Sequence, residues 1–181
     1  MISVFLADGF EEVEALAPID ILRRLGLQVQ LVSVMPTRTV KSSHHVEVHA
    51  DVCFEEANFS QNDALILPGG MPGAANLQAH KGLASLLFNQ AREEGLIDAI
   101  CAAPMVLGGL GLLEGKRATC YPGFEAHLEG AIYTAAQVEE DANFITANGP
   151  GAAFAFSYAI AKRFVPDEAV NALQKAMMFN A

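Results

Sequence analysis

The chain has 181 residues, of which 52 % are hydrophobic and only 18 % are charged. This composition excludes intrinsic disorder, and the length fits a single domain over residues 1–181 with a substantial core. Eleven basic side chains stand against 21 acidic ones, so the formal net charge is −10. Because such a surface repels phosphate backbones and anionic lipids, we expect neither a nucleic acid nor a membrane as partner.

The N-terminal segment and the cysteines indicate the compartment. Met1–Ala7 lacks a basic start, and its apolar run is too short for a signal peptide or a membrane span. Cys53, Cys101 and Cys120 are odd in number and lack zinc-type spacing. We therefore expect a soluble, cytoplasmic protein with three free thiols.

Short apolar runs alternate with helical patterns, which is typical of β-α units around a mostly parallel sheet. The runs predict strands at Ile2–Ala7, Leu27–Val34, Ala64–Leu67, Leu96–Ile100, Thr119–Tyr121, Ile132–Thr134 and Phe144–Ala147, with a hairpin over Thr39–Asp51. Helices are predicted at Glu11–Leu25, Leu83–Glu94, Pro104–Leu110 and Ala152–Lys162, and a last one begins at Pro166. The predicted fold class is α/β.

Four strand ends carry unusual residues. They are Gly9–Glu14, Pro68–Gly70, Ala99–Pro104 and Gly149–Gly151. Ligands bind at the carboxyl ends of strands in open α/β sheets, so these segments mark the candidate site.

Cys101 is the most informative of these residues. It stands between an apolar strand and an immediate helix, which is the pattern of a nucleophile elbow. Helix amides favour the thiolate, so we expect an acidic, reactive thiol. The alternative is a buried structural cysteine, because free cysteines are among the most buried residues.

The glycine pair Gly69-Gly70 has two interpretations. It forms a tight turn, or it lets the backbone approach a substrate, so that the amides of Gly70 and Ala102 form an oxyanion hole. The spacing leaves both open.

Three glutamates follow the first predicted strand, namely Glu11, Glu12 and Glu14. Acidic residues are favoured in the first turn of a helix. One of them can instead point at the strand ends, where a nearby thiolate would raise its pKa and leave it protonated to hydrogen-bond the sulfur.

Other patterns favour neither a metal nor a nucleotide. His45, Glu47 and His49 share one face of the predicted hairpin, and such a set is more often solvated than metal-binding. Gly108–Gly111 lacks the context of a dinucleotide fingerprint. We therefore expect no cofactor and no metal.

Taken together, the motifs resemble the DJ-1/ThiJ/PfpI superfamily, specifically its DJ-1/ThiJ branch. The matching segments are Gly9–Glu14, Pro18–Asp20, Leu67–Gly70, Ala99–Pro104, Tyr121–Glu125 and Gly149–Gly151. The resemblance implies a flavodoxin-like, three-layer α/β sandwich with a mostly parallel sheet, usually assembled as a homodimer.

The same resemblance implies site residues. Cys101 would be the nucleophile and redox-sensitive thiol, Glu14 its hydrogen-bonding acid, and Gly70 with Ala102 the backbone donors, next to Gly69. Three further positions are candidates for lining the site. Tyr121 replaces a histidine of many animal members, and His44 and Asn148 replace arginines of some relatives.

The resemblance also implies a function. The expected activity is cysteine-dependent, cofactor-free conversion of small aldehydes such as glyoxal and methylglyoxal to hydroxy acids, as a glyoxalase or deglycase in stress protection. The alternative is a redox-sensing chaperone whose binding depends on the oxidation state of Cys101. One elbow serves both functions, so the sequence does not separate them.

Overall fold

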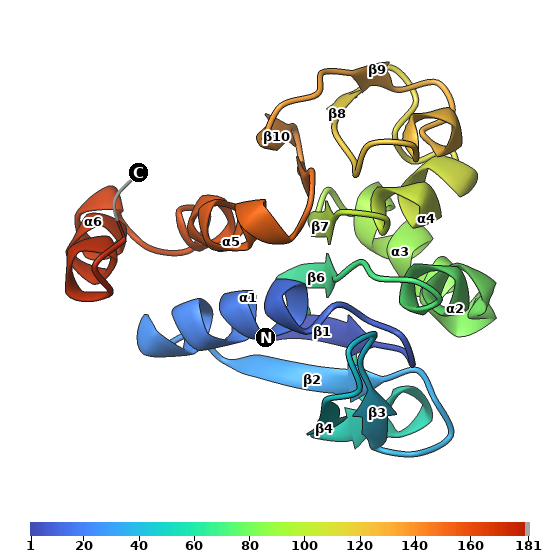
Figure 1. Ribbon diagram of the computed structural model, residues 1–181, viewed down its shortest axis with the longest axis horizontal. Coiled ribbons are helices and arrows are strands. Elements are labelled where there is room, and N and C mark those ends of the chain that lie inside the picture. Colours follow the sequence, from blue (N-terminus) through green and yellow to red (C-terminus); the bar gives the residue numbers. More distant parts are fainter. Residues whose placement is uncertain (180–181) are drawn as a thin grey trace.

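A seven-stranded sheet forms the centre of the computed structural model, which describes residues 1–179 (Figure 1). The strands follow the order β10-β11-β7-β6-β1-β2-β5 across the sheet. Their bounds are β1 Ile2–Leu6, β2 Val29–Ser33, β5 Val52–Cys53, β6 Ala64–Leu67, β7 Leu96–Ile100, β10 Val138–Asp141 and β11 Phe144–Ala147. All pairings are parallel except that of β10 with β11, so the predicted α/β class with a mostly parallel sheet is confirmed.

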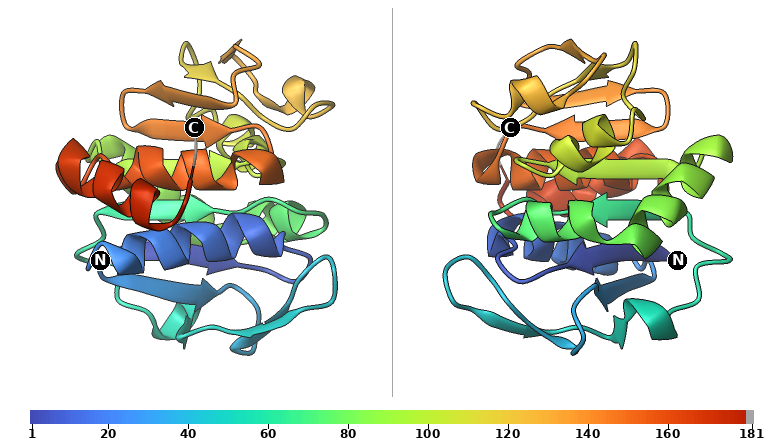
Figure 2. Two further views of the ribbon diagram at one scale, coloured as in Figure 1. Left: turned by 60° about the vertical axis from the view of Figure 1, so that its left-hand side comes forward. Right: turned by 90° about the vertical axis from the view of Figure 1, so that its right-hand side faces the viewer.

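Six helices cover the two faces of the sheet, which gives three layers. One face carries α1 Glu12–Arg24, α5 Ala153–Ala161 and α6 Asp167–Ala176, and the other carries α2 Gly73–Ala79, α3 Lys81–Arg92 and α4 Pro104–Gly109. Figure 2 shows the first group in front of the sheet on the left and the second group in front on the right. Every residue of β1, β6 and β7 is buried, as expected for strands covered on both faces.

Two small sheets complete the fold. The predicted hairpin is present as β3 Thr39–Lys41 paired antiparallel with β4 Glu47–His49. The other pair is β8 Arg117–Ala118 with β9 Ile132–Tyr133. No helix of the described residues is long and apolar enough to cross a membrane.

The predicted strand at Thr119–Tyr121 is wrong. The strand in this region is β8, which ends at Ala118, because the next amide, that of Thr119, donates to Thr146 Oγ1 at 2.9 Å. The amide of Tyr121 then donates to the carbonyl of Cys101 at 2.8 Å. Among the α-helices and strands of the described residues, α2, β5 and β10 were not predicted. β10 reads Val-Glu-Glu-Asp, so its edge position gives it no continuous apolar signal.

Parallel pairing brings the carboxyl ends of four strands to one edge of the sheet. The loops that follow β1, β6, β7 and β11 begin there at Ala7, Pro68, Cys101 and Asn148. This edge is where the predicted site residues meet.

Candidate active site

Cys101 stands on a sharp turn between β7 and α4. Its backbone has a φ of +65°, a conformation that non-glycine residues seldom adopt. Two hydrogen bonds fix the turn: the Cys101 amide donates to Ala147 O at 2.8 Å, and the Cys101 carbonyl accepts from Tyr121. The residue is 8 % exposed, and the elbow predicted from the sequence is present.

Gly69 and Gly70 pack against this turn with no room for a side chain. A Cβ on Gly69 would lie 2.7 Å from Cβ of Cys101 and 2.8 Å from Oε2 of Glu14. Gly70 has a φ of +85°, and a Cβ there would lie 2.5 Å from the amide nitrogen of Glu11. The pair therefore forms a tight turn that packs closely against the elbow, whereas its role as a substrate-binding backbone stays a prediction.

Glu14 is the glutamate that faces the thiol. Its side chain is fully buried, and its Oε2 accepts a 2.9 Å hydrogen bond from the amide of Gly69. Its Oε1 is buried and has no hydrogen-bond partner among the described residues. The Cys101 side chain is close enough to act on the pKa of this carboxyl.

The other two glutamates of the motif have different surroundings. Glu11 precedes α1 and caps it, because its Oε2 accepts from the Glu14 amide at 2.8 Å. Glu12 turns toward His44, whose Nδ1 lies 3.0 Å from Oε1 of Glu12. The three acidic residues thus divide into a helix cap, a surface pair and a buried acid, which the sequence pattern alone could not distinguish.

Burial dominates the electrostatics of the pair formed by Glu14 and Cys101. It raises the pKa of Glu14 to about 7, and the negative charge of Glu11 adds to this effect. Burial also raises the pKa of Cys101 to about 12, and the negative charge of the adjacent Glu14 carboxyl acts in the same direction. The amides of Gly70 and Ala102 lower it without reversing the outcome. The expectation of an acidic thiol is therefore wrong, because desolvation outweighs the helix amides.

The amides of Gly70 and Ala102 are the donors that reach the sulfur of Cys101. The sequence analysis named the same two amides as an oxyanion hole, and that role stays a prediction. Gly69 was predicted to be one of the substrate-binding groups. In the structure its amide donates a hydrogen bond to Glu14. Its contribution is to hold the acid and to leave space for the thiol.

The structure brings two of the three lining candidates to the elbow. Tyr121 is bonded to it through its backbone, and the ring, 45 % exposed, lies 3.1 Å from where a Cβ of Gly149 would be. Asn148 directly follows Ala147, the acceptor of the Cys101 amide, and its own amide donates to Gln137 O at 3.1 Å. His44 lies in the turn between β3 and β4, where its largely exposed ring is paired with Glu12 of α1.

One group of potential metal ligands occurs among the described residues. Glu11, Glu12 and His44 offer ligand atoms within 4.8 Å of one another. This set differs from the hairpin set weighed in the sequence. The hydrogen bond from Glu14 to Glu11 and the ion pair of Glu12 with His44 already account for it, so the geometry does not call for an ion.

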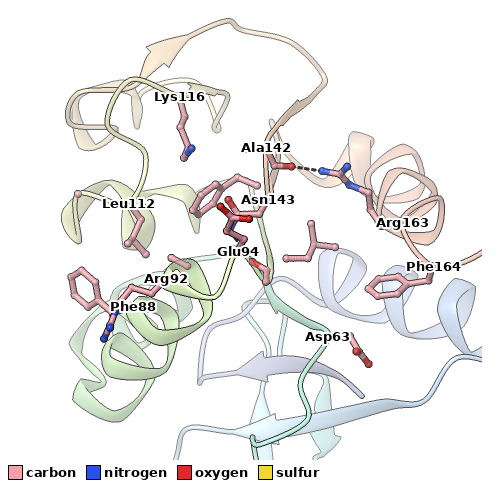
Figure 3. Close-up of a pocket in the computed structure, with 15 residues that line it drawn as sticks. Asp63, Phe88, Arg92, Glu94, Leu112, Lys116, Ala142, Asn143, Arg163 and Phe164 are labelled. Atoms are coloured by element: carbon pink, nitrogen blue, oxygen red, sulfur yellow. Dashed lines mark hydrogen bonds between the residues drawn. The ribbon is translucent and has the colours of Figure 1, made fainter.

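A cleft of about 840 Å³, shown in Figure 3, does not include Cys101 among the residues that line it. It sits at the amino ends of β7 and β11 and is bordered by Arg92, Lys116 and Arg163. Arg92 ends α3, where a helix favours a cation, Lys116 lies 5.4 Å from the centre of the Phe144 ring, and Arg163 donates to Ala142 O. Each of the three cationic side chains at this cleft therefore has a favourable contact within the protein, so their presence does not indicate a bound ligand.

The fold and the elbow define a class: an α/β sandwich with a cysteine above the centre of its sheet and a buried carboxyl beside it. Residues 1–163 match the DJ-1/PfpI family, and the chain belongs to this family. The crystal structure of a DJ-1 superfamily protein from Salmonella typhimurium superposes with a TM-score of 0.95. It is 34 % identical and covers 99 % of this chain and 98 % of its own.

Curated relatives carry several names. "Protein DJ-1 homolog B" of Arabidopsis thaliana is 36 % identical over 98 % of this chain, which spans only 41 % of that longer protein. A protein named deglycase from Pyrococcus abyssi is 32 % identical over 84 % of this chain and 92 % of its own length. A glutathione-independent glyoxalase of Caenorhabditis elegans is 35 % identical over 92 % and 89 %, respectively.

Proposed function

We propose that this protein converts small reactive dicarbonyls, such as glyoxal and methylglyoxal, to hydroxy acids by cysteine-dependent, cofactor-free catalysis. The observation that carries the proposal is the Glu14 carboxyl, which is buried against Cys101 with one oxygen held by Gly69 and the other unpartnered. Relatives named deglycase and glyoxalase support the same chemistry.

The buried Glu14 carboxyl lies beside Cys101 and can accept its proton, so the first step starts from the thiol, in keeping with the raised pKa of Cys101. As Sγ bonds to the aldehyde carbon, the Glu14 carboxylate takes the thiol proton, and the carbonyl electron pair moves to oxygen. The amides of Gly70 and Ala102 stabilise the negative charge. Return of the proton to this oxygen gives a hemithioacetal.

The second step moves a proton between adjacent carbons. Glu14 removes the hydrogen of the former aldehyde carbon as a proton, which gives an enediolate, and returns it to the neighbouring carbon, while the hydroxyl proton of the first carbon passes to the oxygen of the second. The product is a thioester of the hydroxy acid. One carbon is oxidised as the other is reduced, so no external oxidant takes part.

Water then cleaves the bond between the acyl carbon and Sγ, which releases the hydroxy acid and restores the thiol. The net reaction is dicarbonyl plus water to hydroxy acid. A pKa near 7 suits Glu14 for both duties, because it accepts and donates protons at neutral pH.

The test is production of the acid, identified by mass spectrometry, from methylglyoxal without added cofactor. Cys101→Ala should abolish it while circular dichroism shows an intact fold, and Cys53→Ala, at the far edge of the sheet, serves as the matched thiol control. Glu14→Gln keeps the shape but cannot transfer the proton, so the rate should fall about 10²–10⁴-fold. Wild-type rates in Cys101→Ala would refute the proposal.

A further inference from the structure

Glu11 is an unusual residue for its position. It caps α1, although serine, threonine, aspartate and asparagine are the preferred caps. It is only 8 % exposed, although glutamates are seldom buried without a cation. Among the described residues it has no ion pair within 4.0 Å, and the His44 ring lies within 4.8 Å of it.

Three hydrogen bonds join Glu11, Gly69 and Glu14 in a closed ring. The Glu11 amide donates to Gly69 O at 2.9 Å, and the Gly69 amide donates to Oε2 of Glu14 at 2.9 Å. The Glu14 amide donates back to Oε2 of Glu11 at 2.8 Å. In an ordinary capping box the third helical residue would reach the cap amide directly. Here the backbone carbonyl and amide of Gly69 stand between the Glu11 amide and the Glu14 carboxyl, and they direct this carboxyl toward Cys101.

We propose that Glu11 is a positioning residue of this site, which acts on Cys101 through Glu14. The proposal rests on the role given to Glu14 above, but not on the identity of the substrate. It divides into a geometric part, the ring of hydrogen bonds, and an electrostatic part, the negative charge next to the buried acid.

The electrostatic part depends on what faces Glu14. Glu11 reaches it from the loop before α1, and Cys101 from the elbow after β7. The loop after β6 contributes only the backbone of Gly69, and Glu12 is turned to His44. The charge of Glu11 therefore raises the pKa of Glu14, in addition to the effect of burial.

The experiment follows the ¹³C signal of the Glu14 carboxyl against pH, with the signal assigned by its loss in Glu14→Gln. Glu11→Gln keeps an oxygen acceptor for the Glu14 amide but removes the charge. We expect its midpoint for Glu14 to lie at least about 0.5 pH unit below that of the wild type. Glu12→Gln removes the same charge one residue away and should leave the midpoint unmoved.

Glu11→Ala removes the cap as well, so we expect it to lower the melting temperature in addition to the midpoint, whereas Glu11→Gln keeps the melting temperature. An unchanged midpoint in Glu11→Gln would overturn the proposal and reduce Glu11 to a helix cap. Methylglyoxal turnover of the wild type, measured in parallel, tests the proposed function separately. A shifted midpoint without turnover would refute that function and support the role of Glu11.

Discussion

Asp98 allows a quantitative test of the core beneath the elbow. It lies in the middle of β7, in register with Ile66 of β6 and Ile145 of β11, and is completely buried. Neither carboxyl oxygen has a hydrogen-bond partner among the described residues. Burial raises the pKa of Asp98 well above its usual range; the positive charge of Arg163 opposes this and the negative charge of Glu140 adds to it.

The sign and size of the effect follow from proton binding. In the unfolded chain an aspartate has its ordinary pKa of about 3.9. In the folded protein Asp98 keeps its proton to a much higher pH. Stability is thus lost as pH rises from about 3.9 to the folded pKa, by about 1.4 kcal/mol per unit. Stability therefore falls throughout the pH range between the unfolded and the folded pKa. The unpartnered neutral carboxyl costs about 1–3 kcal/mol more.

Asp98→Ala should remove the pH-dependent loss of stability and the cost of the unpartnered carboxyl. It leaves a small cavity, which lowers this gain in stability by on the order of 1 kcal/mol. Urea unfolding at pH 5, 6 and 7, followed by circular dichroism because the chain has no tryptophan, gives the free energy of unfolding of each protein. We expect the stability of the variant relative to the wild type to rise with pH across this range, by about 1.4 kcal/mol for each pH unit below the folded pKa of Asp98. Glu14 titrates in both proteins, so its contribution cancels.

Asp20→Ala is the matched control, because it removes an exposed aspartate from a surface pair with Arg24. Its pH dependence should follow that of the wild type. Parallel stability curves for Asp98→Ala and the wild type would refute the reasoning, since they would mean that Asp98 is ionised in the folded core.

Two further predictions concern the site itself. Gly69→Ala should lower both stability and Cys101 function, because its Cβ would lie 2.7 Å from Cβ of Cys101; an unchanged melting temperature would show that the turn has room. Peroxide should oxidise Cys101 before Cys120, because the amides of Gly70 and Ala102 can hold the oxygens of a sulfinate and Cys120 is fully buried. Peptide mass mapping during a peroxide titration decides this, and simultaneous oxidation of both thiols would contradict it.

The sequence predicted the elements whose signals are local. The strands at Ala64–Leu67, Leu96–Ile100 and Phe144–Ala147 match β6, β7 and β11, and the elbow at Cys101 is where the strand-to-helix pattern places it. Asp98 did not disturb the prediction of β7, because four apolar neighbours suffice to define the strand. Its cost appears only when both faces of the sheet are covered.

Features set by distant segments could not be predicted in the same way. Whether Glu11, Glu12 or Glu14 faces the thiol depends on the Gly69 peptide, more than 50 residues away in the chain. The pKa of Cys101 was predicted with the wrong sign, since a helix start is visible in a sequence but burial under a neighbouring loop is not. The spacing of Glu11 and Glu14, three residues apart as in a capping box, was the signal from which the helix cap at Glu11 could have been predicted. The homodimer and the chaperone alternative stay predictions.

The elbow is assembled from four parts of the chain that only parallel strand pairing brings together: the starts of the loops after β1, β6, β7 and β11. Such long-range pairing forms late and slowly during folding. Until it forms, Cys101 is an ordinary cysteine in water with a pKa of about 8.5, whereas the native site holds its pKa near 12. Folding therefore makes this thiol less acidic, and we expect alkylation of Cys101 at neutral pH to be slower in the native protein than in the unfolded chain.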